Sequence, residues 1–137
     1  MILIIDIMIT HICFIIYIGG DGPTRRSLYD SILSGCIPVV FNDYHLLTSP
    51  WHWGPFAKNA SVYIDENKIM SGEIDLIQYL QAIPQEQIKA MQHTISKYGH
   101  RIQYALDDYR NDAFEIMLKG IYRYGMMRRP KDNNTIV

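Results

Sequence analysis

The sequence predicts an α/β fold, because one stretch combines a glycine-rich turn, an amphipathic helix and a buried strand. The turn, residues 19–22, holds three glycines, which let the backbone approach a ligand closely or adopt a positive φ. Apolar residues then recur at helical spacing from residue 28 to 33, and Gly35 suits the end of such a helix. The next run, residues 37–41, is continuously apolar, as are strands covered on both faces. Turn, helix and strand in this order form half of a βαβ unit.

The start of the predicted helix is a candidate anion site. Free N–H groups and the helix dipole favour a phosphate there. Arg25 and Arg26 oppose that dipole, and a bound anion would explain them, since guanidinium groups grip phosphate oxygens in pairs. Asp30 lies about 9 Å along the axis from Thr24, a suitable distance from a pyrophosphate to a ribose. A solvated basic helix start with an exposed aspartate is the alternative from these residues alone.

Length and composition indicate one globular domain. The 137 residues are 48% hydrophobic and 20% charged, which is enough to bury a core. A net charge of −1 gives no electrostatic case for nucleic acid binding. No set of residues has the spacing of a zinc site, so no metal is expected. Cys13 and Cys36 both lie in apolar runs, and we expect them to be buried free thiols.

The first eighteen residues are almost continuously apolar and long enough for a membrane helix. Asp6 and His11 interrupt the run, however, and β-branched isoleucine dominates it. We therefore predict a strand at 12–17, directly before the turn, and keep a membrane helix as the alternative. The predicted organisation is an atypical apolar start at 1–13, a domain at 14–124 and a polar tail at 125–137.

The rest of the chain predicts one more strand and three more helices. Residues 61–65 alternate as a strand does. Ser71 is the expected N-cap of one helix, and Pro84 starts the next, which breaks at Gly99. Asp112 opens the last helix. Two glycosylation sequons, Asn59-Ala60-Ser61 and Asn133-Asn134-Thr135, are compatible with a secretory-pathway lumen.

One long run of residues resembles a known family. Its matching positions are Gly20-Asp21, Thr24-Arg25-Arg26-Ser27, Tyr29-Asp30-Ser31 and Gly35-Cys36-Ile37-Pro38-Val39. This run closely resembles the nucleotide-sugar-binding segment of exostosin-type glycosyltransferases (GT47), and most nearly the plant branch that includes xyloglucan galactosyltransferases. The likeness continues more weakly, through Trp51-His52, to about residue 122. It corresponds to only the carboxyl-terminal part of such an enzyme.

The resemblance implies a Rossmann-like domain, the C-terminal half of a GT-B glycosyltransferase on the lumenal side of the Golgi membrane. The implied reaction is inverting transfer from a UDP-sugar, with UDP-galactose the first choice, to a polysaccharide or glycan hydroxyl. The resemblance also implies that backbone N–H groups and cations, rather than a cofactor or metal, stabilise the leaving diphosphate. The implied partners are the nucleotide-sugar donor, the glycan or polysaccharide acceptor and an N-terminal domain. Self-association of the chain through the exposed inter-domain face is also expected.

The resemblance also assigns roles to single residues. The donor-binding residues are Gly20, Asp21, Thr24, Arg25, Arg26 and Asp30. Trp51 and His52 are candidate contacts to the base or sugar, whereas Trp53 is expected to pack inside. The general base is expected in the N-terminal domain, so no catalytic residue is assigned here, and the isolated chain is expected to be inactive.

Two other functions compete with this interpretation. A non-catalytic nucleotide-sugar-binding or scaffold module would keep the fold without the chemistry. A Rossmann oxidoreductase is disfavoured, because no Gly-x-Gly-x-x-Gly precedes the helix and Pro23 occupies part of the loop.

Overall fold

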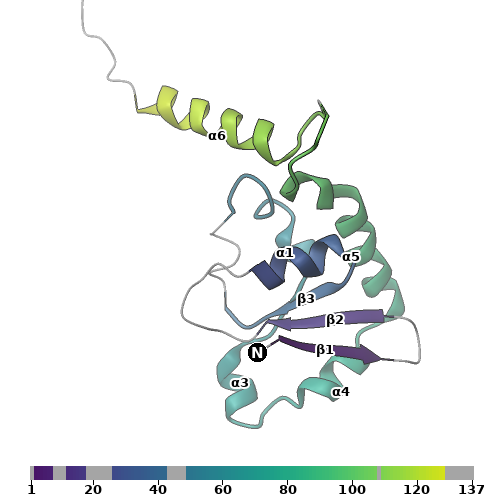
Figure 1. Ribbon diagram of the computed structural model, residues 1–137. Coiled ribbons are helices and arrows are strands. Elements are labelled where there is room, and N and C mark those ends of the chain that lie inside the picture. The colour runs from purple at the N-terminus through teal and green to yellow at the C-terminus, as the bar shows by residue number, and fades with distance from the viewer. Residues whose placement is uncertain (1, 8–11, 18–25, 43–48, 108, 129–137) are drawn as a thin grey trace, which may run out of the picture.

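The computed structural model describes residues 2–7, 12–17, 26–42, 49–107 and 109–128. These residues contain a four-stranded sheet with the order β1-β2-β3-β4 (Figure 1). Its strands are β1 (Ile2–Ile7), β2 (Ile12–Tyr17), β3 (Ile37–Val40) and β4 (Val62–Tyr63). The last three are parallel, while β1 pairs antiparallel with β2. Parallel strands combined with helices confirm the predicted α/β class.

The apolar start of the chain forms strands. β2 has the predicted bounds, and β1 adds a strand that was not predicted. Their register runs from Ile2 opposite Tyr17 to Ile7 opposite Ile12. Isoleucine favours extended backbone, and two strands joined by only four residues can pair only antiparallel. Within the described ranges, no helix is long and apolar enough to cross a membrane.

Helix α1 (Arg26–Leu33) connects β2 to β3 and packs on both strands. Its carboxyl end is a Schellman motif, as the glycine predicted: the Cys36 N–H donates to Ser31 O (2.9 Å) and the Gly35 N–H donates to Ile32 O (3.1 Å). Gly35 has a φ of 77°, the left-handed conformation that this motif requires.

Cys13 and Cys36 form a disulfide, so the expectation of free thiols is wrong. Their Cα atoms are 4.8 Å apart. Phe14 pairs with Ile37 in the parallel register of β2 and β3, which places the two preceding cysteines side by side. The strand register creates this proximity, which the separation of 23 residues along the chain did not reveal.

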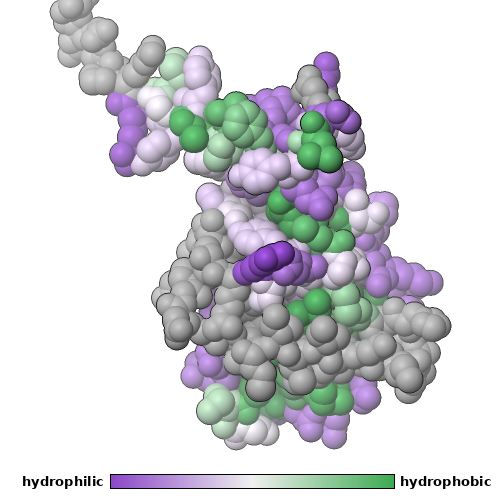
Figure 2. All heavy atoms as spheres, viewed as in Figure 1, coloured by the Kyte–Doolittle hydropathy of each residue, from purple (hydrophilic) through white to green (hydrophobic). Residues whose placement is uncertain are grey.

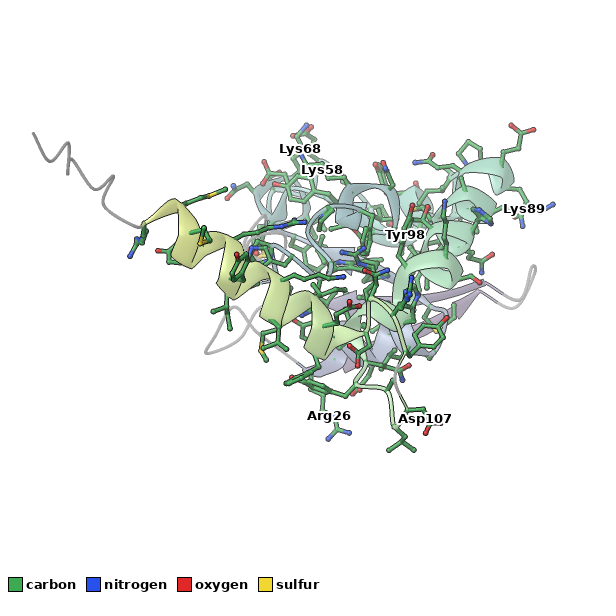
Figure 3. All side chains as sticks on the ribbon, turned by 90° about the horizontal axis from the view of Figure 1, so that it is seen from above. Arg26, Lys58, Lys68, Lys89, Tyr98 and Asp107 are labelled. Atoms are coloured by element: carbon green, nitrogen blue, oxygen red, sulfur yellow. A yellow bond between two sulfur atoms is a disulfide. The ribbon has the colours of Figure 1, made fainter. Side chains whose placement is uncertain are left out.

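The core lies on both faces of the sheet. All four residues of β3 are buried, which requires cover on each side. In Figure 3, Arg26 of α1 and Lys89 of α5 (Gln85–Tyr98) extend on opposite sides of the sheet. The core side chains from these two helices are Leu28, Ile32, Ile88, Met91 and Ile95.

Two short helices follow β4 and correct the prediction made for Ser71. Ser71 is not an N-cap; it ends α3 (Glu66–Met70), which is capped instead by Asp65. Helix α4 (Leu76–Gln81) begins after Asp75, whose carboxylate accepts the Gln78 N–H at 3.0 Å. In both helices the aspartate supplies the oxygen acceptor that the free N–H groups need. The predicted strand at 61–65 is reduced to the two residues of β4.

Helix α5 begins after Pro84, close to the predicted start, and ends where Gly99 was expected to interrupt it. The chain continues as a 3₁₀ turn, η2 (Gly99–Ile102), and Leu106 lies outside any helix. A second 3₁₀ turn, η1 (Ala57–Asn59), precedes β4.

Helix α6 (Ala113–Met127) opens after Asp112, as predicted, and extends away from the sheet (Figure 1). The Trp51 ring packs directly on the backbone of Gly120. Much of the remaining apolar surface of α6 is exposed, and Figure 2 shows green side chains gathered on it. The exposed apolar residues of α6 are Phe114, Leu118, Ile121, Tyr122, Tyr124, Met126 and Met127.

The contact between Trp51 and Gly120 predicts that α6 tolerates no side chain at residue 120. A Cβ there would lie 2.2 Å from Trp51 Cε3. Gly120→Ala should therefore lower the free energy of unfolding by about 1–3 kcal/mol, the usual cost of overpacking. Urea unfolding of the purified chain measures the change.

Gly125 is the matched control, because a Cβ added at this residue would meet no heavy atom within 4 Å. Gly125→Ala should raise stability by about 0.5–1 kcal/mol, since alanine is the better helix former. In a Trp51→Ala background, Gly120→Ala should no longer destabilise. Equal changes in the free energy of unfolding for Gly120→Ala and Gly125→Ala would show that the Trp51 ring does not pack tightly on Gly120.

Asp112 predicts a pH-dependent anchor for α6. Its carboxylate accepts the N–H groups of Glu115 (2.8 Å) and Ala105 (3.1 Å), and these bonds, Glu115 first, lower the pKa of Asp112. A lowered folded pKa gives stability that is complete above the unfolded value of about 3.9 and is lost as pH falls through the folded value.

Asp112→Ala should therefore reduce stability at neutral pH, and its difference from the parent chain should shrink below about pH 4. Asp75→Ala is the control, and its loss of stability should be smaller. Asp75 accepts one backbone N–H, from its own helix, whereas Asp112 accepts one from α6 and a second from Ala105. Thermal unfolding across pH checks both variants. A difference that stays constant down to about pH 2 would contradict the capping role.

Candidate functional site

The candidate donor site lies at the carboxyl edge of the parallel strands. β2 runs to this edge, α1 starts there and runs back, and β3 returns to it. Ligand sites of open α/β sheets lie outside this edge. Four predicted donor-binding residues, Gly20, Asp21, Thr24 and Arg25, lie outside the described residues. The structure describes the other two, Arg26 and Asp30.

Arg26 and Asp30 lie on the same side of α1, one turn apart. Arg26 Nε is 3.5 Å from Asp30 Oδ2, and the two side chains are 92% and 56% exposed. Water screens so open a pair, which therefore contributes little to stability. A ligand can engage either group without breaking a strong internal contact.

The neighbours of Asp30 have structural contacts instead. The Tyr29 hydroxyl hydrogen-bonds the Ser49 hydroxyl, which ties the segment after β3 to α1. Ser31 is fully buried and donates its hydroxyl to Leu28 O at 2.6 Å. Of the triplet Tyr29-Asp30-Ser31, only the aspartate therefore presents an exposed side chain toward solvent.

Trp51 and His52 both contact α6 or its approach. The Trp51 carbonyl accepts a hydrogen bond from Arg101 Nη2 at 3.0 Å, and the Trp51 ring lies on Gly120. His52 donates from Nε2 to Ala113 O at 3.0 Å. Trp51 nevertheless stays 38% exposed, so one part of its ring remains open to a ligand. Trp53 is 1% exposed and packs in the core, as expected.

A groove of about 560 Å³ is lined both by the Trp51 segment and by α6. Cationic and aromatic side chains line it, among them Trp51, Arg101, Lys119, Arg123 and Tyr124. The Arg101 Nε is buried and has no hydrogen-bond partner among the residues that the structure describes, and the Arg101 guanidinium lies over the Phe56 ring at 5.4 Å. Sequence reasoning did not single out Arg101, because no motif surrounds it.

The described part of the chain brings no three histidine, cysteine, aspartate or glutamate side chains together in a way that could hold a metal ion. The acidic side chains at the start of α6 have other partners: Asp112 accepts the Glu115 N–H, and the Lys119 ammonium and the Asn111 N–H lower the pKa of Glu115.

Comparison with known proteins identifies the family. Residues 8–82 match the Exostosin GT47 domain. The chain is 36% identical over 103 residues to the probable xyloglucan galactosyltransferase GT13 of Arabidopsis thaliana, covering 71% of this chain and 22% of the relative. It is 33% identical over 107 residues to the xyloglucan galactosyltransferase MUR3 of the same plant, covering 74% of this chain and 17% of the relative. No solved structure matches.

The chain thus spans about a fifth of the length of the curated relatives that it matches. The matched family domain includes the glycine-rich turn, α1 and β3, where the candidate donor residues lie. The matched domain and the similarity to the Arabidopsis enzymes agree with the resemblance noted from the motif around Asp30. The chain belongs to the exostosin GT47 glycosyltransferase family, in the plant xyloglucan galactosyltransferase-type branch.

Proposed function

We propose that this chain is the donor-binding part of an inverting GT-B glycosyltransferase of the Golgi lumen, and that it binds a UDP-sugar, with UDP-galactose the first choice. The observation that carries the proposal is the position of Arg26 and Asp30, exposed on one side of α1 at the carboxyl edge of the sheet. The names of the relatives, which are xyloglucan galactosyltransferases, support galactose as the sugar and a polysaccharide as the acceptor.

In this proposal the diphosphate lies at the start of α1. Backbone N–H groups of the turn around Gly20 and Asp21, together with Thr24 and one of Arg25 and Arg26, bind its oxygens. The charge that develops on the leaving UDP is thereby stabilised in place. Asp30, one turn further along the helix, accepts a ribose hydroxyl. Trp51 offers the open part of its ring to the base or sugar.

The exposed apolar face of α6 supports a further part of the proposal. Phe114, Leu118 and Ile121 recur at helical spacing and are each about half exposed. Such a stripe is typical of a surface that another domain covers. We assign it to contact with an N-terminal domain, which also supplies the general base, and in the isolated chain it favours self-association.

The competing function is a non-catalytic nucleotide-sugar-binding or scaffold module. It shares the donor site, so binding alone cannot separate the two functions. They differ in whether loss of the donor site abolishes sugar transfer by a full-length protein.

Replacing Arg26 tests the donor site. Arg26→Ala should weaken UDP binding by about 1.5–3 kcal/mol if Arg26 grips the diphosphate, the range for hydrogen bonds to charged groups. Adjacent helical residues point about 100° apart, so only one of Arg25 and Arg26 need show this loss. Calorimetric titration of UDP measures it. Lys89→Ala is the matched control, because Lys89 lies on the opposite side of the sheet (Figure 3).

Asp30→Asn separates two roles for the carboxylate. A ribose contact predicts weaker UDP binding and nearly unchanged pyrophosphate binding. If Asp30 acts only by holding Arg26, affinity for both ligands should fall together, because the two side chains are paired. Unchanged UDP affinity in the Arg25, Arg26 and Asp30 variants would refute the site.

The 137-residue chain alone is expected to transfer no galactose from UDP-galactose to a xyloglucan oligosaccharide. Acceptor activation needs a base within hydrogen-bond reach, and the proposal places that base in the N-terminal domain. Mass spectrometry of the oligosaccharide reads the product, with a full-length relative as the positive control. Efficient transfer by the isolated chain would contradict the proposal. Loss of transfer when Arg26 is replaced in the full-length protein would exclude the scaffold alternative.

A further inference from the structure

We propose that Asn59 is an N-glycosylation site, and that its glycan projects from the side of the domain opposite the candidate donor site. Asn59-Ala60-Ser61 fits the acceptor pattern, with alanine rather than proline at the middle position. The second sequon, at residues 133–135, lies outside the described residues. The structure therefore bears on Asn59 alone.

The Asn59 side chain is available for modification. Asn59 is the last residue of η1 and is exposed, whereas Ala60 beside it is fully buried. The Asn59 backbone N–H donates to Phe56 O at 3.0 Å, but within the described ranges its side-chain amide has no hydrogen-bond partner that a glycan would have to displace. Lys58, its neighbour, lies on the opposite side of the molecule from Arg26 (Figure 3). A glycan here would leave the start of α1 open.

The surface around Asn59 suits the first sugars of a glycan. Asn59 borders a groove of about 500 Å³, with polar and aromatic groups along it, among them His93, Thr94, Lys97 and Tyr98. His93 and Lys97 are exposed and offer hydrogen bonds to sugar hydroxyls. Arg26 and Asp30, the two candidate donor residues that the structure describes, do not line this groove.

The disulfide supplies an independent reason to expect the modification. Cys13 and Cys36 are bonded, and disulfides form and persist in oxidising compartments such as the lumen of the endoplasmic reticulum. Asparagine-linked glycans are added in that lumen. The inference shares its compartment with the proposed function, but it depends on neither UDP binding nor sugar transfer.

The proposed step is the transfer of an oligosaccharide from a lipid diphosphate by the cell's own transferase. A bond forms between Asn59 Nδ2 and the anomeric carbon, the bond from that carbon to the phosphate oxygen breaks, and the lipid diphosphate leaves. A base of the transferase takes the Nδ2 proton. In the folded chain the Ser61 hydroxyl donates to Ala57 O at 2.6 Å, so a transferase that reads this hydroxyl must act before the segment folds.

The test is translation of the chain, behind a cleavable secretory signal, in the presence of endoplasmic reticulum microsomes. Asn133→Gln is placed in every variant to remove the other sequon. Only the protease-protected, signal-cleaved fraction is scored, so every scored molecule has reached the lumen. We expect a band of lower electrophoretic mobility. Treatment with an endoglycosidase that cleaves asparagine-linked glycans should remove this band. Absence of the band from the untreated fraction would overturn the proposal.

Three variants tie the glycan to Asn59. Asn59→Gln and Ser61→Ala should both abolish the shifted band. Ser61→Ala does so while Asn59 is still present, because it removes only the hydroxyl that the sequon requires. Ser61→Thr should keep it, because threonine retains the hydroxyl for both the sequon and the bond to Ala57. A shifted band that persists in Asn59→Gln would also refute the assignment. UDP titration of the glycosylated and unglycosylated chains should give equal affinities, since the glycan lies away from α1.

Discussion

The parallel pairing of β2 with β3 is the constraint on which the rest of the structure depends. Once Phe14 lies beside Ile37, α1 must run back across the sheet, and its first turn must lie at the carboxyl edge. The same register brings Cys13 to Cys36 and closes a covalent link at the opposite edge. The link therefore holds the amino ends of the two strands together, whereas the edge that carries the candidate donor site is left to noncovalent contacts.

A second contact, between Trp51 and Gly120, determines how the last helix is held. The hydrogen bond between the Tyr29 and Ser49 hydroxyls fixes the segment after β3 to α1. In the same segment, the Trp51 ring packs against Gly120 of α6. Arg101 reinforces the contact by donating to the Trp51 carbonyl. Helix α6 is thus connected, through packed side chains, to the helix whose start forms the candidate site. These contacts connect α6 to α1 without a break. Energetic coupling between α6 and a bound donor would further require that both favour the same arrangement of the contacting side chains.

The sequence predicted those elements whose signals are local. Helix α1, its glycine end and β2 follow from periodicity and turn chemistry within a few residues, and they were predicted close to their observed bounds. The predicted N-cap at Ser71 was wrong because Asp65 caps α3 and Asp75 caps α4. The disulfide and β1 depend on strand pairing, which no single segment encodes. In the candidate site, Asp30 and Arg26 were named from the motif, while Arg101 has no motif and became visible only through its contacts with Trp51 and Phe56.

The start of α1 is electrostatically unfavourable by itself, and this is the clearest reason to expect a ligand there. The first turn of α1 has no acidic residue, and it carries Arg26 where a cation costs about 0.3–1 kcal/mol. Burial of Leu28 and Ile32, each contributing about 1.5–3 kcal/mol, exceeds that cost and keeps the helix formed. The fold therefore stabilises α1 from its buried face and its Schellman end, and can leave its amino end positive. An anion such as a diphosphate would complement both the helix dipole and the Arg26 guanidinium, and this is why we propose the start of α1 as the donor site.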